Sequence, residues 1–203
     1  MPSRTRKTFF ADYSFDVWEN VYEPAEDSFL FAENLTVKED ESVLDMGTGC
    51  GILGIVAAAK AARVVAVDIS PYAIHCAKEN AKLNKVVDKM FFVQGDLFTP
   101  LKAEGKFDLI LFNSPYLPTE PMEDKAWLGR AWAGGVAGRQ IIDRFIRGSP
   151  EHLRQNGRIL LLQSTLSDVD RTLEILEKIS KVAVVAKRNL PFFESIALIE
   201  AKP

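Results

Sequence analysis

The chain has 203 residues, of which 47% are hydrophobic and 26% charged, the composition of an ordinary globular domain. Its net charge of −3 gives no overall attraction to a nucleic-acid backbone, and no apolar stretch approaches the roughly 18–20 residues needed to span a bilayer. The two cysteines and two histidines show no metal-ligand spacing, so the sequence predicts no bound metal. We therefore expect one cytoplasmic domain over residues 1–203.

The first forty residues differ in kind from the rest. They are rich in aromatic residues and then contain YEPAEDSFLFAENL, which predicts a helix beginning near Pro24, with Glu26 and Asp27 in its acidic first turn. From residue 42 onward, short apolar runs alternate with helical patterns. The predicted strands are 42–46, 63–68, 90–96, 107–112, 157–164, 181–189 and 194–202. The predicted helices are 52–62, 70–84, 135–155 (which Pro150 should break or kink) and 166–180. This alternation predicts a parallel sheet covered on both faces.

The segment VLDMGTGCGILG (43–54) joins the first of these strands to the following helix. Gly47, Gly49 and Gly51 let the chain turn sharply and bring bare backbone against a ligand. Part of the segment, GCGILG, also matches the dinucleotide fingerprint, which is weak by itself. A glycine turn without any ligand is the simpler alternative.

Three aspartates end three successive predicted strands. They favour a ligand that contains a nucleoside but no pyrophosphate, and so argue against a dinucleotide. A carboxylate at Asp45, just before the glycines, suits an amino-acid ammonium group and would repel a pyrophosphate. Asp68 ends the second strand, where a carboxylate can accept from both ribose hydroxyls. Asp96 ends the third, where it can accept from an adenine amino group. An amino-acid tail, a ribose and an adenine together describe S-adenosylmethionine.

With these residues, the chain resembles the class I S-adenosylmethionine-dependent methyltransferases over nearly its whole length, from Asp45 to the final strand. The resemblance implies a Rossmann-like α/β fold: a seven-stranded, mostly parallel sheet with helices on both faces and an antiparallel last strand. The last two predicted strands fit a closing hairpin of that kind. Ile69 and Leu97, next to Asp68 and Asp96, complete the implied cofactor-binding set.

The strand FDLILF ends in Asn113, Ser114, Pro115 and Tyr116, and NSPY resembles the N-P-P-Y motif of methyltransferases that modify planar amino or amide nitrogens. Such a nitrogen has a delocalised lone pair and is a poor nucleophile, so it must be held with that lone pair toward the methyl group. The Asn113 carboxamide oxygen, beside the cofactor, and the Ser114 carbonyl can each accept one N–H. Pro115 biases Ser114 toward an extended backbone, and Tyr116 offers a stacking ring. Such catalysis works by positioning. Because Ser114 replaces the usual proline, the direction of its carbonyl is less firmly fixed.

The motif alone does not separate a protein glutamine from adenine or guanine. However, VYEPAEDSFL (21–30) resembles a segment of the archaeal and eukaryotic release-factor glutamine methyltransferases (the HemK-like group). This resemblance implies that residues 1–40 cover the cofactor site, with Tyr22, Pro24 and Ser28 near the cofactor and Asp27 near the substrate. The segment AWAGGVAGRQIIDRF (131–145) resembles the glycine-containing segment that follows the motif in the same group. Neither an added nucleic-acid-binding domain nor a strongly basic face is visible in the sequence.

We therefore expect a protein-(glutamine-N5) methyltransferase acting on the Gly-Gly-Gln loop of a class I translation release factor. The alternative is an adenine-N6 or guanine-N2 methyltransferase on RNA or DNA, and a third hypothesis is a cofactor-binding regulator without catalysis. The family resemblance also implies a small zinc-binding activator that pairs with the sheet edge. The apolar run MFFVQ (90–94) is the expected edge strand, and an apolar exposed edge is a liability unless it is paired.

Overall fold

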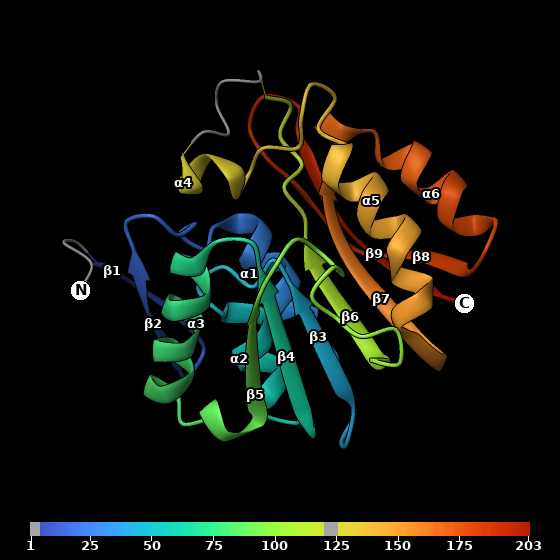
Figure 1. Cartoon of the computed structure of the whole chain (residues 1–203). Helices are drawn as coiled ribbons and strands as arrows, with labels where there is room; N and C mark the ends of the chain where they lie inside the picture. Colours follow the sequence, from blue (N-terminus) through green and yellow to red (C-terminus); the bar gives the residue numbers. More distant parts are fainter. Residues whose placement is uncertain (1–4, 120–125) are drawn as a thin grey trace.

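The short apolar runs form a seven-stranded sheet in the computed structural model, which describes residues 5–119 and 126–203 (Figure 1). In spatial order the strands are β5 (Met90–Gln94), β4 (Arg63–Asp68), β3 (Ser42–Met46), β6 (Phe107–Asn113), β7 (Leu153–Ser164), β9 (Ser195–Lys202) and β8 (Lys181–Asn189). The first five are parallel to one another, and β9 is antiparallel to both β7 and β8. The predicted mostly parallel sheet with an antiparallel last strand is confirmed.

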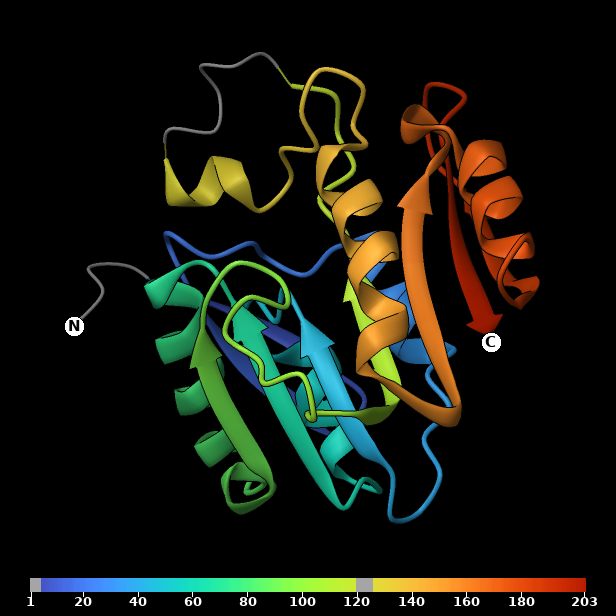
Figure 2. The same cartoon turned by 45° about the vertical axis from the view of Figure 1, so that its right-hand side comes forward.

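Helices cover both faces of this sheet, because successive side chains of a strand point to opposite sides. On β6, Leu109 and Leu111 belong to one core cluster, whereas Ile110 and Phe112 belong to the other. The helices of the first cluster are α1 (Glu26–Glu33), α2 (Ile52–Ala58) and α3 (Pro71–Leu83). Those of the second are α5 (Gln140–Gly148) and α6 (Val169–Glu177) (Figures 1 and 2). Burial on both faces explains why the strands are continuously apolar.

A separate two-stranded hairpin precedes the sheet in the chain. It consists of β1 (Thr5–Phe10) and β2 (Tyr13–Trp18), which the sequence analysis did not predict. The backbone N–H of Asp16 donates to Oδ1 of Asn80 at 2.8 Å, and that of Ser14 donates to Oδ1 of Asn84 at 3.1 Å. These two bonds fasten the hairpin to α3. Its position depends on partners 64 and 70 residues away, which no local pattern reveals.

The largest difference from the predicted elements lies between residues 135 and 157. The predicted helix 135–155 is wrong at both ends, because α5 covers only 140–148 and β7 already begins at Leu153. Pro150 breaks the helix as expected and lies in a 3₁₀ turn, Ser149–His152. The other short helices in the described part of the chain are α4 (Trp127–Arg130), Val87–Lys89 and Thr165–Ser167. Over residues 5–119 and 126–203, no helix has the length and apolar character that a bilayer crossing requires.

Candidate functional site

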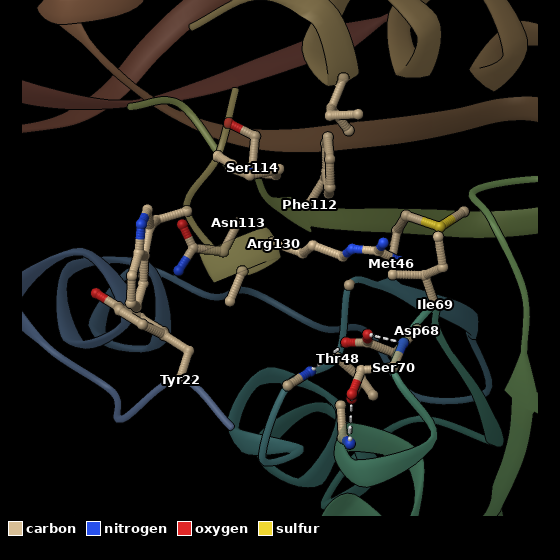
Figure 3. Close-up of a pocket in the computed structure, with 18 of the residues that line it drawn as sticks. Tyr22, Met46, Thr48, Asp68, Ile69, Ser70, Phe112, Asn113, Ser114 and Arg130 are labelled. Atoms are coloured by element: carbon tan, nitrogen blue, oxygen red, sulfur yellow. Dashed lines mark hydrogen bonds between the residues drawn. The ribbon is translucent and has the colours of Figure 1, made fainter. Parts of the chain in front are cut away.

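A cavity of about 550 Å³ opens at the carboxyl ends of the parallel strands (Figure 3). Its walls come from the residues that follow β3, β4, β5 and β6, and from the segment before and at the start of α1. This is the edge of an open α/β sheet at which ligands are generally bound. All the predicted site residues line the cavity except Asp45 and Gly51.

The glycine loop after β3 turns through three left-handed residues. Gly47, Gly49 and Gly51 have φ angles of 67°, 57° and 91°, which side chains with a Cβ rarely adopt. Gly51 serves a packing role, because a Cβ there would crowd Ala77 of α3 and Ile55 of α2. The glycines therefore divide into two that line the cavity and one that lets two helices approach.

Asp45, in β3 just before this loop, holds the loop and the start of α2 by hydrogen bonds. One of its carboxylate oxygens accepts from the Thr48 hydroxyl at 2.6 Å and from the Gly54 backbone N–H at 2.9 Å. Burial raises the pKa of Asp45 to about 7, although the two hydrogen bonds oppose the shift. From the sequence we expected this carboxylate to face the amino-acid part of the cofactor, but in the structure it points toward α2 and away from the cavity wall.

Asp68 joins the end of β4 to the glycine loop. Its Oδ2 accepts from the Gly49 backbone N–H and its Oδ1 from that of Ser70, both at 2.9 Å (Figure 3). Burial raises the pKa of Asp68, and these backbone hydrogen bonds lower it in part. Each oxygen keeps a second lone pair, so the carboxylate remains able to accept from a ligand. Ile69, which is 41% exposed, follows it in the cavity wall.

The third predicted aspartate is paired with a cation that the sequence analysis missed. Asp96 Oδ2 accepts from Nη2 of Arg144, a residue of α5, at 2.6 Å, and both line the cavity together with Leu97. Asp96 lies two residues beyond β5, which ends at Gln94 rather than at residue 96. Arg144 was within the segment 131–145 noted in the sequence, but nothing local indicated that it would contact Asp96.

Asn113 is held by the N-terminal part of the chain. Its Nδ2 donates to Asp27 Oδ2 at 3.1 Å and to Ser28 Oγ at 3.2 Å. The opposite carboxylate oxygen of Asp27 accepts from the Tyr22 hydroxyl at 3.0 Å and from the Ser28 N–H at 2.6 Å. Among the described residues, the Asn113 amide oxygen is buried and has no hydrogen-bond partner. A flipped amide would set this oxygen against a carboxylate, so Asp27 fixes which way Asn113 points.

Ser114 is fastened to the neighbouring strand. Its hydroxyl donates to the Leu162 carbonyl of β7 at 2.7 Å, and its backbone N–H donates to the same oxygen at 3.4 Å. These bonds restrain the residue that stands where the motif has proline. Pro115 and Tyr116 continue the cavity wall. Burial, followed by the charge of Asp27, raises the pKa of Tyr116 above its ordinary value, so its hydroxyl stays protonated.

The segment after NSPY pairs with the glycine-containing segment before α5 to form one side of the cavity. Leu117 N–H donates to the Trp132 carbonyl at 3.0 Å, and Gly134 N–H donates to the Leu117 carbonyl at 2.9 Å. A Cβ at Gly138 would overlap the carbonyl oxygen of Tyr116, which explains why this segment needs glycine. Trp132, Gly135 and Gln140 line the cavity here, as do Trp127 and Arg130 of α4. The Arg130 guanidinium lies 4.8 Å from the Trp127 ring centre.

Arg139 anchors that paired segment from behind. Its side chain is buried, with Nη1 donating to the backbone carbonyls of Ser167 at 2.7 Å and Asp168 at 2.5 Å, and Nη2 pairing with Asp143 at 2.8 Å. Gly138, the residue before it, therefore stays pressed against Tyr116. Within residues 5–119 and 126–203, no group of three or more histidine, cysteine, aspartate or glutamate side chains could hold a metal ion.

Comparisons with known proteins agree with this geometry. The family described as "Ribosomal protein L11 methyltransferase (PrmA)" matches residues 27–114. A Methanocaldococcus jannaschii protein named "Putative protein N5-glutamine methyltransferase" is 44% identical over 181 residues, covering 88% of this chain and 90% of that protein. The Mus musculus "Methyltransferase HEMK2" is 35% identical over 156 residues, covering 71% and 72%. The E. cuniculi Mtq2–Trm112 complex, described as methylating the eRF1 translation termination factor, has a TM-score of 0.66 at 23% identity, covering 90% and 98%.

Together with these relatives, the sheet with its antiparallel β9 and the cavity at the strand ends identify the chain as a class I S-adenosylmethionine-dependent methyltransferase. At these identities over most of both sequences, the chain belongs to the protein N5-glutamine methyltransferase family that includes HEMK2.

The buried Asp45 carboxyl predicts a pH-dependent stability difference. Because its pKa is raised on folding, the wild type loses stability as the pH rises from about 4 to about 7, whereas Asp45→Asn keeps the oxygen acceptor and has no charge to bury. The unfolding free energy of the variant minus that of the wild type should therefore grow over this range, by at most about 1.4 kcal/mol per pH unit. Urea unfolding of both proteins at pH 5 and pH 8 measures it. If the unfolding free energies of the two proteins differ by the same amount at both pH values, the predicted cost of burying the Asp45 carboxylate is contradicted.

Proposed function

We propose that this chain transfers the methyl group of S-adenosylmethionine to the side-chain amide nitrogen of the glutamine in the Gly-Gly-Gln loop of a class I translation release factor. The observation that carries the proposal is the Asn113 amide, whose nitrogen is held by Asp27 and Ser28 and whose buried oxygen has no partner in the described part of the chain. A buried acceptor without a donor is costly, so a donor from the substrate is the natural complement.

The residues at the end of β6 suit a substrate amide as the group that receives the methyl. When bound, S-adenosylmethionine supplies an electrophilic methyl group on a positively charged sulfur. The chain's task is then to fix the direction of a weak nucleophile. Asn113 Oδ1 accepts one N–H of the substrate amide, and the Ser114 carbonyl, restrained through Leu162, accepts the other. Tyr116 stacks on the flat amide. No strong base is required, and positioning of this kind supplies the rate enhancement.

The residues of the cavity fit the parts of the cofactor. Backbone at Gly47 and Gly49 can approach it closely, the carboxylate of Asp68 accepts from the ribose hydroxyls, and Asp96 accepts from the adenine amino group. Ile69 and Leu97 supply apolar walls. The side of the cavity formed by residues 20–28 is closed by Tyr22, Pro24 and Ser28. A volume of about 550 Å³ is within the range of cofactor pockets.

Two observations favour a protein substrate over a nucleic acid: the charge of the residues that line the cavity, and the names of the relatives. Among the described residues, three carboxylates (Asp27, Asp68 and Asp96) and two guanidinium groups (Arg130 and Arg144) line the cavity, and a net negative charge there repels phosphates. The names of the relatives point the same way, since several are release-factor glutamine methyltransferases at 31–35% identity. A substrate that works on the ribosome also agrees with a cytoplasmic location. Methylation of an adenine or guanine amino group in RNA or DNA is the competing outcome.

A partner at the sheet edge belongs to the same proposal. β5 is the edge strand, as expected, and its Phe91 is 55% exposed. An apolar open edge favours pairing with another chain. We expect a small zinc-binding protein to pair there, in line with the Mtq2–Trm112 complex of the E. cuniculi structure.

Removal of the Asp68 carboxylate should weaken cofactor binding. In Asp68→Ala the ribose hydroxyls lose a charged acceptor, which is typically worth about 1.5–3 kcal/mol, or roughly ten- to a hundredfold in affinity. Calorimetric titration with S-adenosylmethionine measures the change. Unchanged affinity, or tight binding of NAD by the wild type, would contradict the assignment.

Incubation with labelled cofactor tests the substrate. Release factor with an intact Gly-Gly-Gln loop should become labelled, and a factor with that glutamine changed should not. The Asn113→Ala variant should fail to label it while still binding the cofactor. The assay is run with and without the zinc-binding partner, and total RNA and DNA are offered in parallel. Labelling of nucleic acid alone under both conditions would establish the competing outcome.

A further inference from the structure

The turn between β8 and β9 carries two phenylalanine side chains that contact nothing in the described chain. Phe192 and Phe193 are 97% and 104% exposed, more than any other large hydrophobic residue described. Both have left-handed backbones, with φ of 61° and 63°, a conformation that costs a bulky residue free energy. A surface turn selected only for stability would place glycine or asparagine at such positions.

This turn is held firmly by its neighbours. Leu190 N–H donates to the Glu194 carbonyl across the turn at 2.8 Å, and the Ser164 hydroxyl donates to the Glu194 carboxylate at 2.6 Å. Ser195 N–H donates to the Thr165 hydroxyl oxygen at 3.0 Å. The two rings are therefore carried by a backbone turn that is anchored to the end of β7, so that little ordering of the turn itself is needed on binding.

The turn lies at the same edge of the sheet as the cavity. Because β9 is antiparallel to both of its neighbours, the carboxyl end of β8 lies at the edge where β6 and β7 also end (Figures 1 and 2). Glu194, next to Phe193, is also near the cavity wall. After burial and the charge of Asp27, its charge contributes to raising the pKa of Tyr22 and of Tyr116. The exposed rings therefore lie at the edge of the sheet at which the cavity opens.

The cavity by itself offers too little contact area to recognise a folded protein. It must hold the cofactor and one glutamine side chain, whereas a specific protein interface buries about 800 Å² on each partner. Two phenylalanine rings bury roughly 150–250 Å² each, and aromatic side chains are frequent centres of binding energy. We propose that Phe192 and Phe193 form a docking element for the protein substrate, which binds an apolar depression on the body of that substrate while its glutamine loop enters the cavity.

This inference rests on the proposed function, and a matched pair of variants tests it. Phe192→Asn with Phe193→Asn removes both rings, and asparagine tolerates the left-handed backbone. The control is Phe9→Asn, which removes a 66% exposed phenylalanine from β1, a strand that contributes no residue to the cavity wall. We expect the double variant to raise both the KM and the calorimetric Kd for intact release factor at least tenfold. Its kcat at saturation and its affinity for S-adenosylmethionine should stay within twofold of the wild type, as should all values for the control.

The outcomes separate the two proposals. A wild type that binds release factor but labels only nucleic acid contradicts the proposed function. Equal Kd values for the wild type and the double variant, or no measurable binding by the wild type, overturn the docking element. Sedimentation of each protein checks for self-association, and loss of a dimer in the double variant with unchanged release-factor affinity would assign the rings to contact between copies instead. Loss of RNA binding with unchanged release-factor affinity would also overturn the inference.

Discussion

The hydrogen bond from the Asn113 amide to the Asp27 carboxylate joins two segments 86 residues apart, and the proposed chemistry of the site depends on it. Asn113 stands at the end of a central strand, where its backbone is fixed but its amide could face either way. Asp27 removes that freedom, because an ionised carboxylate accepts and cannot donate. The buried amide oxygen is thereby left as the group that an incoming N–H can satisfy.

The surrounding fold holds both members of this pair in place. Arg188 of β8 donates to Glu26 at 2.6 Å and to Glu33 at 2.7 Å, so the helix that carries Asp27 is tied to the far edge of the sheet. These are exposed ion pairs that add little stability individually, but together they restrict the position of α1. On the other side, Ser114 is bound to Leu162. The hydroxyl thus supplies by hydrogen bonding a restraint that a proline ring would supply covalently.

The features that depend on residues close together in the sequence could be predicted from the sequence alone. The apolar runs, the glycine loop and the polar residues at the ends of the strands are adjacent in sequence, so their arrangement follows once the sheet is parallel. The direction of Asp45 was not predictable by the same reasoning. Side chains at a strand end alternate, and Met46 rather than Asp45 points into the cavity. The β1–β2 hairpin and the Asp96–Arg144 pair were missed because each depends on a partner about 48–70 residues distant.

The most direct measurement is the single-turnover rate of Asp27→Asn, with Asp170→Asn, the same change at an exposed position of α6 away from the cavity, as the control. Asparagine at position 27 presents an N–H group to the Asn113 side chain. The Asn113 amide then flips, so that its oxygen accepts from residue 27 and its N–H groups face the substrate. We expect the rate constant to fall by about a hundredfold or more, the scale seen when one positioned hydrogen-bonding group is lost, with cofactor affinity nearly unchanged. The control should react at the wild-type rate. A rate for Asp27→Asn within threefold of the wild type would contradict the role of this hydrogen bond.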